Sequence, residues 1–168
     1  MRGLLAGLIA AGAISTASAA TPPITADGWG DLKIGMPEKE AVRRLAMKRV
    51  NVLPDEDSTS CKEFEPAGQP TMIVMTIDGR VARVSLYEKS PLKTDRGFTI
   101  GDREADIRKA YGPALKVEPH AYEGPEGHYL TVWTRPGKRG VRYETNAKGR
   151  VNSIHAGGPQ IEYIEGCL

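Results

Sequence analysis

The expected architecture rests on the run Met72-Ile73-Val74-Met75-Thr76-Ile77-Asp78-Gly79-Arg80-Val81, which continues to Tyr87. The apolar residues predict a buried strand, and Asp78-Gly79 predicts a two-residue hairpin turn, because glycine adopts positive φ without steric cost. Side chains of the return strand alternate between the two faces of a sheet. This alternation predicts a core face and an opposite face, formed respectively by Ala82, Val84, Leu86 and by Arg83, Ser85, Tyr87.

The hairpin signal recurs later in the chain. Lys148-Gly149-Arg150-Val151 follows Asp78-Gly79-Arg80-Val81 by 70 residues (149 − 79). Two helix starts, Ile34-Gly35-Met36 and Ile100-Gly101-Asp102, are 66 residues apart (100 − 34). The near-constant offset predicts two copies of one helix-then-hairpin unit. Aligned through the turns, Ser85 matches His155 and Val84 matches Ile154.

Start and stop signals predict two short helices. Pro37 and the acidic residues after it suit a helix start, so a helix is expected over about 37–48. Asp102 is the expected N-cap of the second helix, and Gly112-Pro113 is its stop. Strands are expected to follow each helix. In the second copy they are expected at 115–118, 128–134, 141–145, 151–156 and 161–164.

Together these elements predict an α+β fold. We expect two tandem helix-plus-antiparallel-sheet units, with the helices on one face of a joined sheet. The first unit is expected over residues 21–95 and the second over 96–168, separated by the polar connector 89–96. The other face of the sheet is expected to be open to solvent, as antiparallel sheets allow.

Residues 1–20 have the pattern of a secretory signal peptide. Arg2 supplies a positive start, residues 4–14 are apolar, and Ala17-Ser18-Ala19 fits the small-residue cleavage rule. The apolar run is shorter than the roughly 20 residues that cross a bilayer. No cysteine follows it, so lipidation is not expected. The mature chain would have about 148 residues (168 − 20) and would be periplasmic or secreted.

Charge and cysteine content narrow the function classes further. The formal net charge is +2, which favours neither nucleic acid nor an anionic membrane as partner. Cys61 and Cys167 are the two cysteines, and export predicts a disulfide between them. The alternative is two free buried thiols. A bridge would close a loop of 106 residues (167 − 61) and would tie the C-terminus to the first half.

The residues that could carry chemistry form no recognisable motif. His120, His128 and His155 suggest a metal site, but their spacing is looser than in structural zinc sites, and we expect no metal or cofactor. The alternative is that they belong to loops and to the sheet face. The serines lie in no nucleophile elbow or Ser-x-x-Lys setting. We therefore expect no enzyme, although a hydrolase with a dispersed site leaves no local signature and stays an alternative.

A candidate binding surface lies on the sheet face opposite the helices. Aromatic residues and arginine are enriched in protein interfaces, and aromatic rings also stack on sugars. The predicted binding residues are Arg83, Tyr87, Tyr129, Trp133, Arg142 and His155. The alternative is that these aromatic residues complete a core, since a one-residue register error exchanges the two faces.

The pattern resembles two related families. One is the outer-membrane-assembly lipoprotein family of the SmpA/OmlA type, and the other is the secreted beta-lactamase inhibitory protein family. The resemblance rests on Ile34-Gly35-Met36 with Ala41 and Leu45, and on Ile100-Gly101-Asp102 with Ile107 and Tyr111. It implies two units whose joined sheets form a concave surface. The lipidation cysteine of the first family and the bridge within each half of the second are missing. No inhibitory loop matches, so beta-lactamase inhibition is not implied.

The sequence therefore predicts an exported, non-catalytic binding protein. We expect it to engage another envelope or extracellular protein through the open sheet face, without nucleic acid and without stable membrane insertion. The alternatives are a carbohydrate- or small-ligand-binding module and the dispersed hydrolase. The histidines and most of the aromatic residues belong to the second copy, so the functional residues are expected mainly within 115–156.

Overall fold

The computed structural model describes residues 21–50 and 60–167. The predicted signal peptide, residues 1–20, lies outside the described residues. No helix among those described has the length and apolar character needed to cross a membrane.

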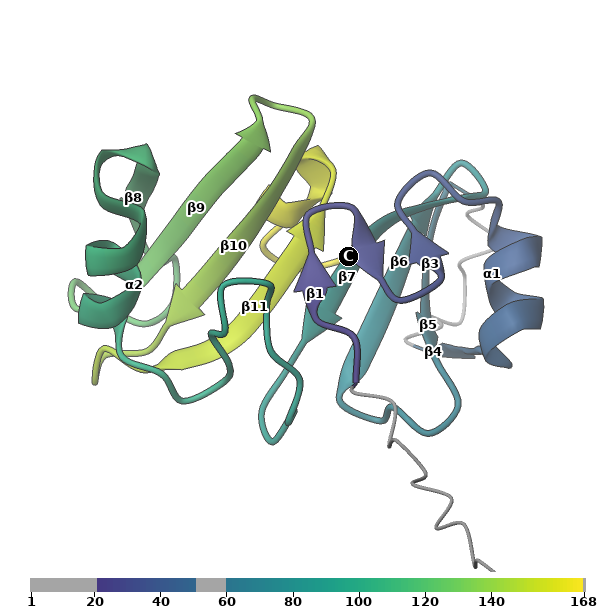
Figure 1. The fold of residues 1–168 in the computed structure, drawn as a ribbon, viewed down its shortest axis with the longest axis horizontal. Coiled ribbons are helices and arrows are strands. Elements are labelled where there is room, and N and C mark those ends of the chain that lie inside the picture. The colour runs from purple at the N-terminus through teal and green to yellow at the C-terminus, as the bar shows by residue number, and fades with distance from the viewer. Residues whose placement is uncertain (1–20, 51–59, 168) are drawn as a thin grey trace, which may run out of the picture.

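One antiparallel sheet dominates the molecule (Figure 1). Its eight strands lie in the order β4-β5-β6-β7-β11-β10-β9-β8. They are β4 (Lys48–Val50), β5 (Cys61–Glu65), β6 (Met72–Ile77), β7 (Arg80–Leu86), β8 (Leu115–Pro119), β9 (His128–Arg135), β10 (Arg139–Thr145) and β11 (Val151–Gly157). A second sheet has three two-residue strands, β1 (Ile24–Thr25), β2 (Gly28–Trp29) and β3 (Leu32–Lys33).

The hairpin expected from the sequence is confirmed. Strands β6 and β7 pair in antiparallel register, with Val74 opposite Val84. Asp78 and Gly79 both have positive φ, 48° and 70°, as a two-residue turn of the favoured twist requires. Val84 and Leu86 belong to the hydrophobic core cluster, so the core face of β7 is the one that alternation predicts.

The predicted fold class is wrong. The chain is mostly β, with 42% strand against 17% helix, and it is not divided into two helix-plus-sheet units. The strands form one continuous sheet because β7 and β11 pair at its centre, where Leu86 faces Ile154. A single hydrophobic cluster also runs beneath the sheet, from Phe64 through Val84 to Leu130. The three-stranded sheet was not predicted, because its two-residue strands are too short to show a period of two.

The helices are short. α1 (Glu38–Leu45) ends at Ala46, which has a left-handed conformation with φ 45°, and residues 48–50 then form β4 rather than the end of a longer helix. α2 (Glu104–Tyr111) starts one position after Arg103 and is followed by the 3₁₀ turn η1 (Gly112–Ala114). The strand expected at 161–164 is instead the 3₁₀ turn η2 (Pro159–Glu162).

The repeated sequence signals make the same contacts twice. The backbone N–H of Gly35 donates to the carbonyl of Val81 at 2.7 Å, and that of Gly101 donates to Val151 at 2.8 Å. The Arg80 guanidinium returns a hydrogen bond to the Gly35 carbonyl at 2.9 Å. Arg150 does the same to Gly101 at 3.2 Å. Each Gly-Arg-Val hairpin is thereby joined to the segment that leads into a helix.

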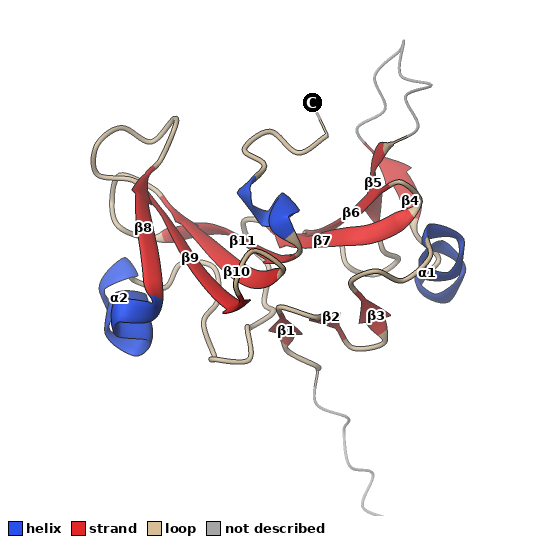
Figure 2. Cartoon of the chain, turned by 90° about the horizontal axis from the view of Figure 1, so that it is seen from above, coloured by secondary structure: helices blue, strands red, loops and turns tan. Residues whose placement is uncertain are grey.

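The two sides of the sheet are covered by different parts of the chain. The helices α1 and α2 and the small sheet lie on one side, and η2 with the C-terminal segment lies on the other, concave side (Figure 2). The predicted disulfide is confirmed: Cys61 on β5 is bonded to Cys167, with 5.5 Å between their Cα atoms. The bridge fixes the C-terminal segment over the concave side.

Candidate functional site

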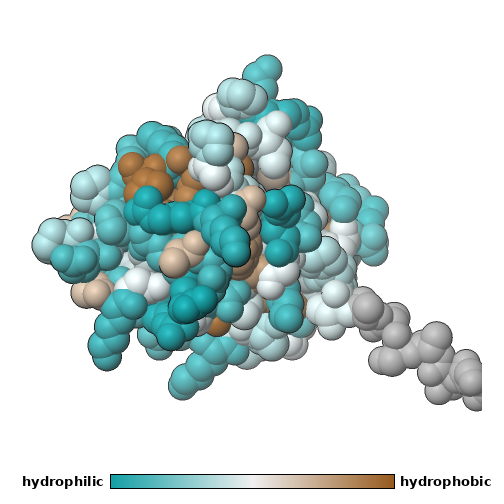
Figure 3. Space-filling view, turned by 60° about the vertical axis from the view of Figure 1, so that its left-hand side comes forward, coloured by the Kyte–Doolittle hydropathy of each residue, from teal (hydrophilic) through white to brown (hydrophobic). Residues whose placement is uncertain are grey.

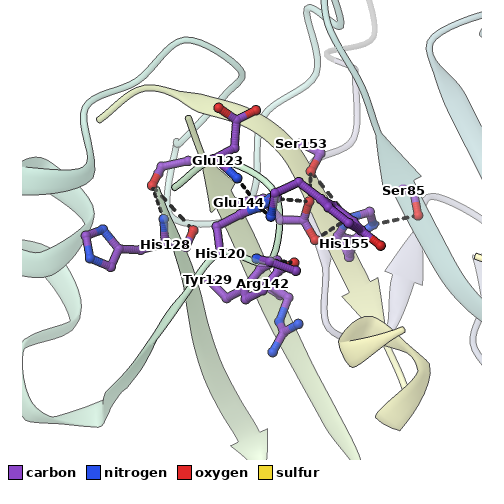
Figure 4. A network of polar contacts seen from close by, with 12 residues as sticks. Ser85, His120, Glu123, His128, Tyr129, Arg142, Glu144, Ser153 and His155 are labelled. Atoms are coloured by element: carbon purple, nitrogen blue, oxygen red, sulfur yellow. Dashed lines mark hydrogen bonds and ion pairs between the residues drawn. The ribbon is translucent and has the colours of Figure 1, made fainter. Parts of the chain in front are cut away.

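A layer of polar side chains lies on the concave side of the sheet. The central strands contribute residues that face one another across the ladders, Ser85 with His155, His155 with Arg142, and Arg142 with Thr131. The residues that alternate with them, such as Val84 and Ala156, point into the core under the helices. Because buried polar groups need hydrogen-bond partners, the layer is internally connected (Figure 4).

The structure brings most of the predicted binding residues together, but it buries four of them. Arg83, Tyr129, Arg142 and His155 are 1%, 5%, 4% and 4% exposed, and they lie beneath other parts of the chain. Among the six, only Tyr87 is exposed, at 38%. Trp133 is half-buried on β9. The six residues therefore share one side of the sheet, of which only part is open.

The C-terminal segment covers the middle of this side. Arg83 donates from Nη1 to the carbonyls of Gln160 at 3.1 Å and Tyr163 at 2.9 Å. Its Nη2 lies 3.6 Å from a carboxylate oxygen of Glu63. At Gly166, an added Cβ would lie 2.6 Å from Glu63 Oε1, so the segment passes close over β5. The buried guanidinium thus holds the segment against the sheet through its backbone.

Three strands supply a connected serine, histidine and glutamate. Ser85 Oγ lies 2.8 Å from His155 Nδ1, and His155 Nε2 lies 3.2 Å from Glu144 Oε1. A carboxylate only accepts, so we assign the imidazole proton to Nε2 and let Ser85 donate to Nδ1. Ser153 Oγ also donates to Glu144, at 2.8 Å. The order of donors is that of a catalytic triad.

The surroundings of Glu144 and His155 determine the protonation states of these two residues. Burial would raise the pKa of Glu144, but hydrogen bonds from His155 and Ser153 outweigh it and lower that pKa to about 2. Burial lowers the pKa of His155, although Glu144 opposes this. At neutral pH the network therefore holds an anionic carboxylate and a neutral imidazole.

Burial separates this network from a working catalytic triad. Ser85 is 0% exposed and lines none of the cavities described in residues 21–50 and 60–167. A nucleophile must approach its substrate to about 3 Å. We therefore interpret the network as a polar link between β7, β10 and β11.

Sequence reasoning missed Ser85, Glu144, Ser153 and His120 as members of one site. One signal did point to the first of them, because Ser85 and His155 are equivalent positions in the repeat alignment. The strands that carry them pair antiparallel at the centre of the sheet, and these two residues are opposite each other. Glu144 and Ser153 are likewise cross-strand partners, but only the register of β10 and β11 reveals this.

One open part of the concave side is a hollow of about 530 Å³ beside the network. We call it the tyrosine hollow. Two exposed rings border it, those of Tyr87 (38% exposed) and Tyr122 (67% exposed). The rest of its lining consists of Pro70, Thr71, Ile73, Glu88, His120, Glu123, Glu144, Asn152 and Ser153.

His120 shapes one wall of the tyrosine hollow. Its Nδ1 accepts hydrogen bonds from the backbone N–H groups of Tyr122 at 3.1 Å and Glu123 at 3.3 Å. Its ring stacks on Tyr129, with 4.4 Å between centroids, and its Nε2 points to Glu144 at 3.6 Å. The hydroxyl of Tyr122 in turn donates to Glu165 of the C-terminal segment. The first part of the 120–127 loop is thus held by contacts with the sheet and with the C-terminal segment.

The histidines do not converge on a metal site. His128 bonds to Glu104 of α2 at 3.1 Å, while His120 and His155 approach Glu144. In the part of the chain that the structure describes, no group of three or more His, Cys, Asp or Glu residues could hold a metal ion.

Comparison with known proteins gives only distant likenesses. No family model matches the chain, and no curated protein matches its sequence. A cysteine-rich secretory protein from Staphylococcus aureus superposes with a TM-score of 0.46 at 12% identity, over 84% of this chain and 49% of that one. The uncharacterised protein yfeY from Escherichia coli gives 0.44 at 14% identity, over 80% and 99%. The chain spans about half the length of the Staphylococcus aureus protein. Neither likeness assigns a function, and the resemblance to the SmpA/OmlA and beta-lactamase inhibitory families stays a prediction.

Proposed function

We propose that this chain is an exported, non-catalytic binding protein that engages another protein at the tyrosine hollow. The observation that carries the proposal is the pair of exposed tyrosines, Tyr87 and Tyr122, that both line the hollow. Tyrosine is enriched in interface cores because it offers a large apolar area with few rotatable bonds and a polar end. The proposed contact surface is therefore an uncovered part of the sheet face, and not the whole face that the sequence predicts.

The disulfide supports the exported part of the proposal. Disulfides persist in oxidising compartments such as the periplasm or the extracellular space, and Cys61–Cys167 is the bridge that an exported chain would keep. The charged residues of the second half also suit a soluble surface. On the side shown in Figure 3, the surface is mostly hydrophilic, with small hydrophobic groups between the polar side chains.

Burial of the polar network supports the non-catalytic part of the proposal. Its hydroxyls and imidazole hydrogen-bond one another, so no activated nucleophile faces the tyrosine hollow. Ser153 lines the hollow, but its hydroxyl donates to Glu144 and lies 3.4 Å from His155 Nε2. A hydrolase would require that the network rearrange before it could act.

Site-specific photo-crosslinking tests the proposal. A photoreactive phenylalanine analogue replaces Tyr122 in one variant and Lys138, in the exposed β9–β10 turn, in a control variant. Both are illuminated in an envelope extract of the source organism, and adducts are identified by mass spectrometry. We expect one discrete protein adduct from position 122 that the Tyr87→Ala substitution removes, and none from position 138. Identical adducts at both positions would contradict the proposal.

A glycan array separates the proposal from the carbohydrate alternative. Specific glycan binding that Tyr87→Ala and Tyr122→Ala abolish would assign the tyrosine hollow to sugars, because aromatic rings also stack on sugar faces. We expect no such signal from the disulfide-bonded protein.

A further inference from the structure

We propose that the tyrosine hollow receives a cationic side chain, arginine above all, from the protein partner. The inference rests on the proposed function and adds the chemistry of the partner's contact. It is carried by the charges, the rings and the open hydrogen-bond acceptors of the hollow.

The first observation is the sign of the charge. Three carboxylates line the tyrosine hollow, those of Glu88, Glu123 and Glu144, and no lysine or arginine is among the described residues that line it. Glu144 is bound by neutral donors, His155 and Ser153, so its charge is solvated without a direct guanidinium partner. Low-dielectric walls focus such a field and favour a cation at the mouth of the hollow.

The two buried arginines of the concave side, Arg83 and Arg142, already bind other groups of the chain. Arg83 binds Glu63 and two carbonyls of the C-terminal segment. Arg142 donates to Thr131 at 3.0 Å, lies 3.4 Å from Glu118, and covers the ring of Tyr129 at 4.4 Å. Neither lines the tyrosine hollow, so neither fills it with positive charge.

The second observation is the pair of rings. A guanidinium stacks on an aromatic face more readily than an ammonium, because it is planar and weakly hydrated. Within the chain, the guanidinium of Arg142 already makes this contact with the ring of Tyr129. Tyr87 and Tyr122 offer exposed rings at the mouth, with carboxylates beside them.

The third observation is the kind of hydrogen-bonding group left open. Glu88 is exposed and makes no ion pair within residues 21–50 and 60–167, and one oxygen of Glu123 accepts only a 3.4 Å bond from the Ala147 N–H. These groups are acceptors. A guanidinium supplies five donors and accepts none, so it complements them.

The size of the hollow favours a side chain presented on a protein over a free cation. A volume of about 530 Å³ is within the range of ligand pockets and exceeds a single guanidinium, so neighbouring residues of the partner can also enter. The mouth is open at the surface, as contact with a folded or extended protein segment requires.

Peptide titration followed by backbone amide NMR tests the inference on the disulfide-bonded protein. The probes are acetyl-Gly-Arg-Gly-amide, the same peptide with neutral citrulline, and agmatine as a free cation. We expect the arginine peptide to shift the amide signals of Tyr87, Tyr122 and Asn152 saturably, and the citrulline peptide to leave them unchanged. Equal binding of the two peptides would overturn the inference. Agmatine binding as tightly as the arginine peptide would assign the hollow to a small amine instead.

Matched variants place the contact. Glu88→Gln with Glu123→Gln keeps the shape of both side chains and removes two charges, and we expect affinity for the arginine peptide to fall about threefold to tenfold. Glu126→Gln, an exposed change in the same loop outside the tyrosine hollow, is the control and should bind as the parent does. Equal losses in both variants would mean that only net charge matters and would overturn the site.

The two proposals fail in distinguishable ways. A crosslinked partner at position 122 without arginine-peptide binding refutes the cation and leaves the binding protein standing. Binding of the arginine peptide without any protein adduct contradicts the proposed protein partner. It therefore also contradicts the inference that the arginine comes from such a partner.

Discussion

At the residue scale, Glu144 determines how the polar network responds to acid. Its pKa is about 2 in the folded protein against an ordinary value of 4.5, so the folded state binds the proton less readily than the unfolded state. Its contribution is therefore fully present above about pH 4.5 and is lost as pH falls through 2. His155 acts in the same direction, because burial lowers its pKa from 6.5. Acidification below 6.5 then favours the unfolded chain, which can protonate that histidine freely.

We predict that the free energy of unfolding falls as pH decreases from 7 to 2. Glu144 alone accounts for up to about 3 kcal/mol of this loss, from the size of its pKa change. Urea unfolding followed by tryptophan fluorescence at a series of pH values measures it. Stability that rises on acidification would contradict the assigned protonation states.

The substitution Glu144→Gln tests the same network at neutral pH. We expect it to lower stability by about 1–3 kcal/mol, since His155 and Ser153 lose a charged acceptor in a buried site. The slope of stability between pH 4.5 and 2 should become shallower than in the parent protein. Glu126→Gln, which changes an exposed carboxylate, is the control and should leave both quantities unchanged. An unchanged acid slope in Glu144→Gln would assign the acid response to other groups.

The serines of the network provide a test of catalysis. We predict that a fluorophosphonate probe does not label Ser85 or Ser153, because Ser85 is 0% exposed and Ser153 5%. Intact-mass spectrometry after several hours, with trypsin labelled in parallel, gives the readout. An adduct at Ser153 that His155→Gln abolishes would establish the hydrolase alternative.

At the element scale, the 120–127 loop maintains the tyrosine hollow by close packing. The N–H of His120 donates to the Gly127 carbonyl at 2.9 Å. A Cβ at Gly127 would lie 2.3 Å from the Glu123 Cβ and 2.9 Å from the Thr145 carbonyl oxygen. The loop therefore has no room for a side chain at that position.

We predict that Gly127→Ala costs about 1–3 kcal/mol, since overpacking forces the loop or β10 to shift. The amide signals of Tyr122 and Glu123 should move, and crosslinking from position 122 should weaken. Pro125→Ala, at an exposed position in the same loop, is the matched control and should do neither. Parent-like melting and crosslinking of Gly127→Ala would show that the loop can move aside without loss.

At the scale of the whole molecule, the disulfide and the sheet act together. The Cys61–Cys167 bridge closes a loop of 106 residues and holds the C-terminal segment across the concave side. Arg83, buried below it, binds the segment through two carbonyls. The covered face is therefore the product of a long-range covalent link and a buried cation.

We predict that the double substitution Cys61→Ser with Cys167→Ser lowers stability by up to about 4.7 kcal/mol, the chain-entropy value for a loop near that length. Hydrogen exchange at residues 160–166 should become faster than exchange in β7 or β11. The carboxymethylated, reduced parent protein should behave alike, which separates the bridge from the serine side chains. Unchanged exchange in the segment would show that Arg83 alone holds it.

Local patterns predicted several elements of this fold well. The β6–β7 hairpin, the positive φ at Gly79 and the inward face of β7 follow from alternation and turn chemistry, which operate over a few residues. The disulfide followed from an even cysteine count in an exported chain. The predicted fold class was wrong because the repeat emphasised helix starts, whereas strands supply more than twice as much of the chain as helices, 42% against 17%.

The candidate site was less accessible to local reasoning. Arg83, Tyr129, Arg142 and His155 were assigned to the side of the sheet on which they lie, but local patterns do not show what packs over them. Arg83, for example, binds a backbone carbonyl 77 residues further along the chain. The strand expected over 161–164 shows the same limit. Residues 159–162 form a 3₁₀ turn that packs on the concave side, and alternation carries no information about that contact.

The amino-acid order alone was enough to predict the hairpin and the bridge, because each depends on backbone preferences or on the chemistry of two residues. The tertiary structure alone decided that Ser85, His155 and Glu144 meet, that the C-terminal segment packs over Arg83, and that Tyr87 and Tyr122 line an open hollow. These outcomes depend on the pairing of β7 with β11 and on strand register. Pairing energy is shared over many distant residues, so no single stretch of sequence specifies it.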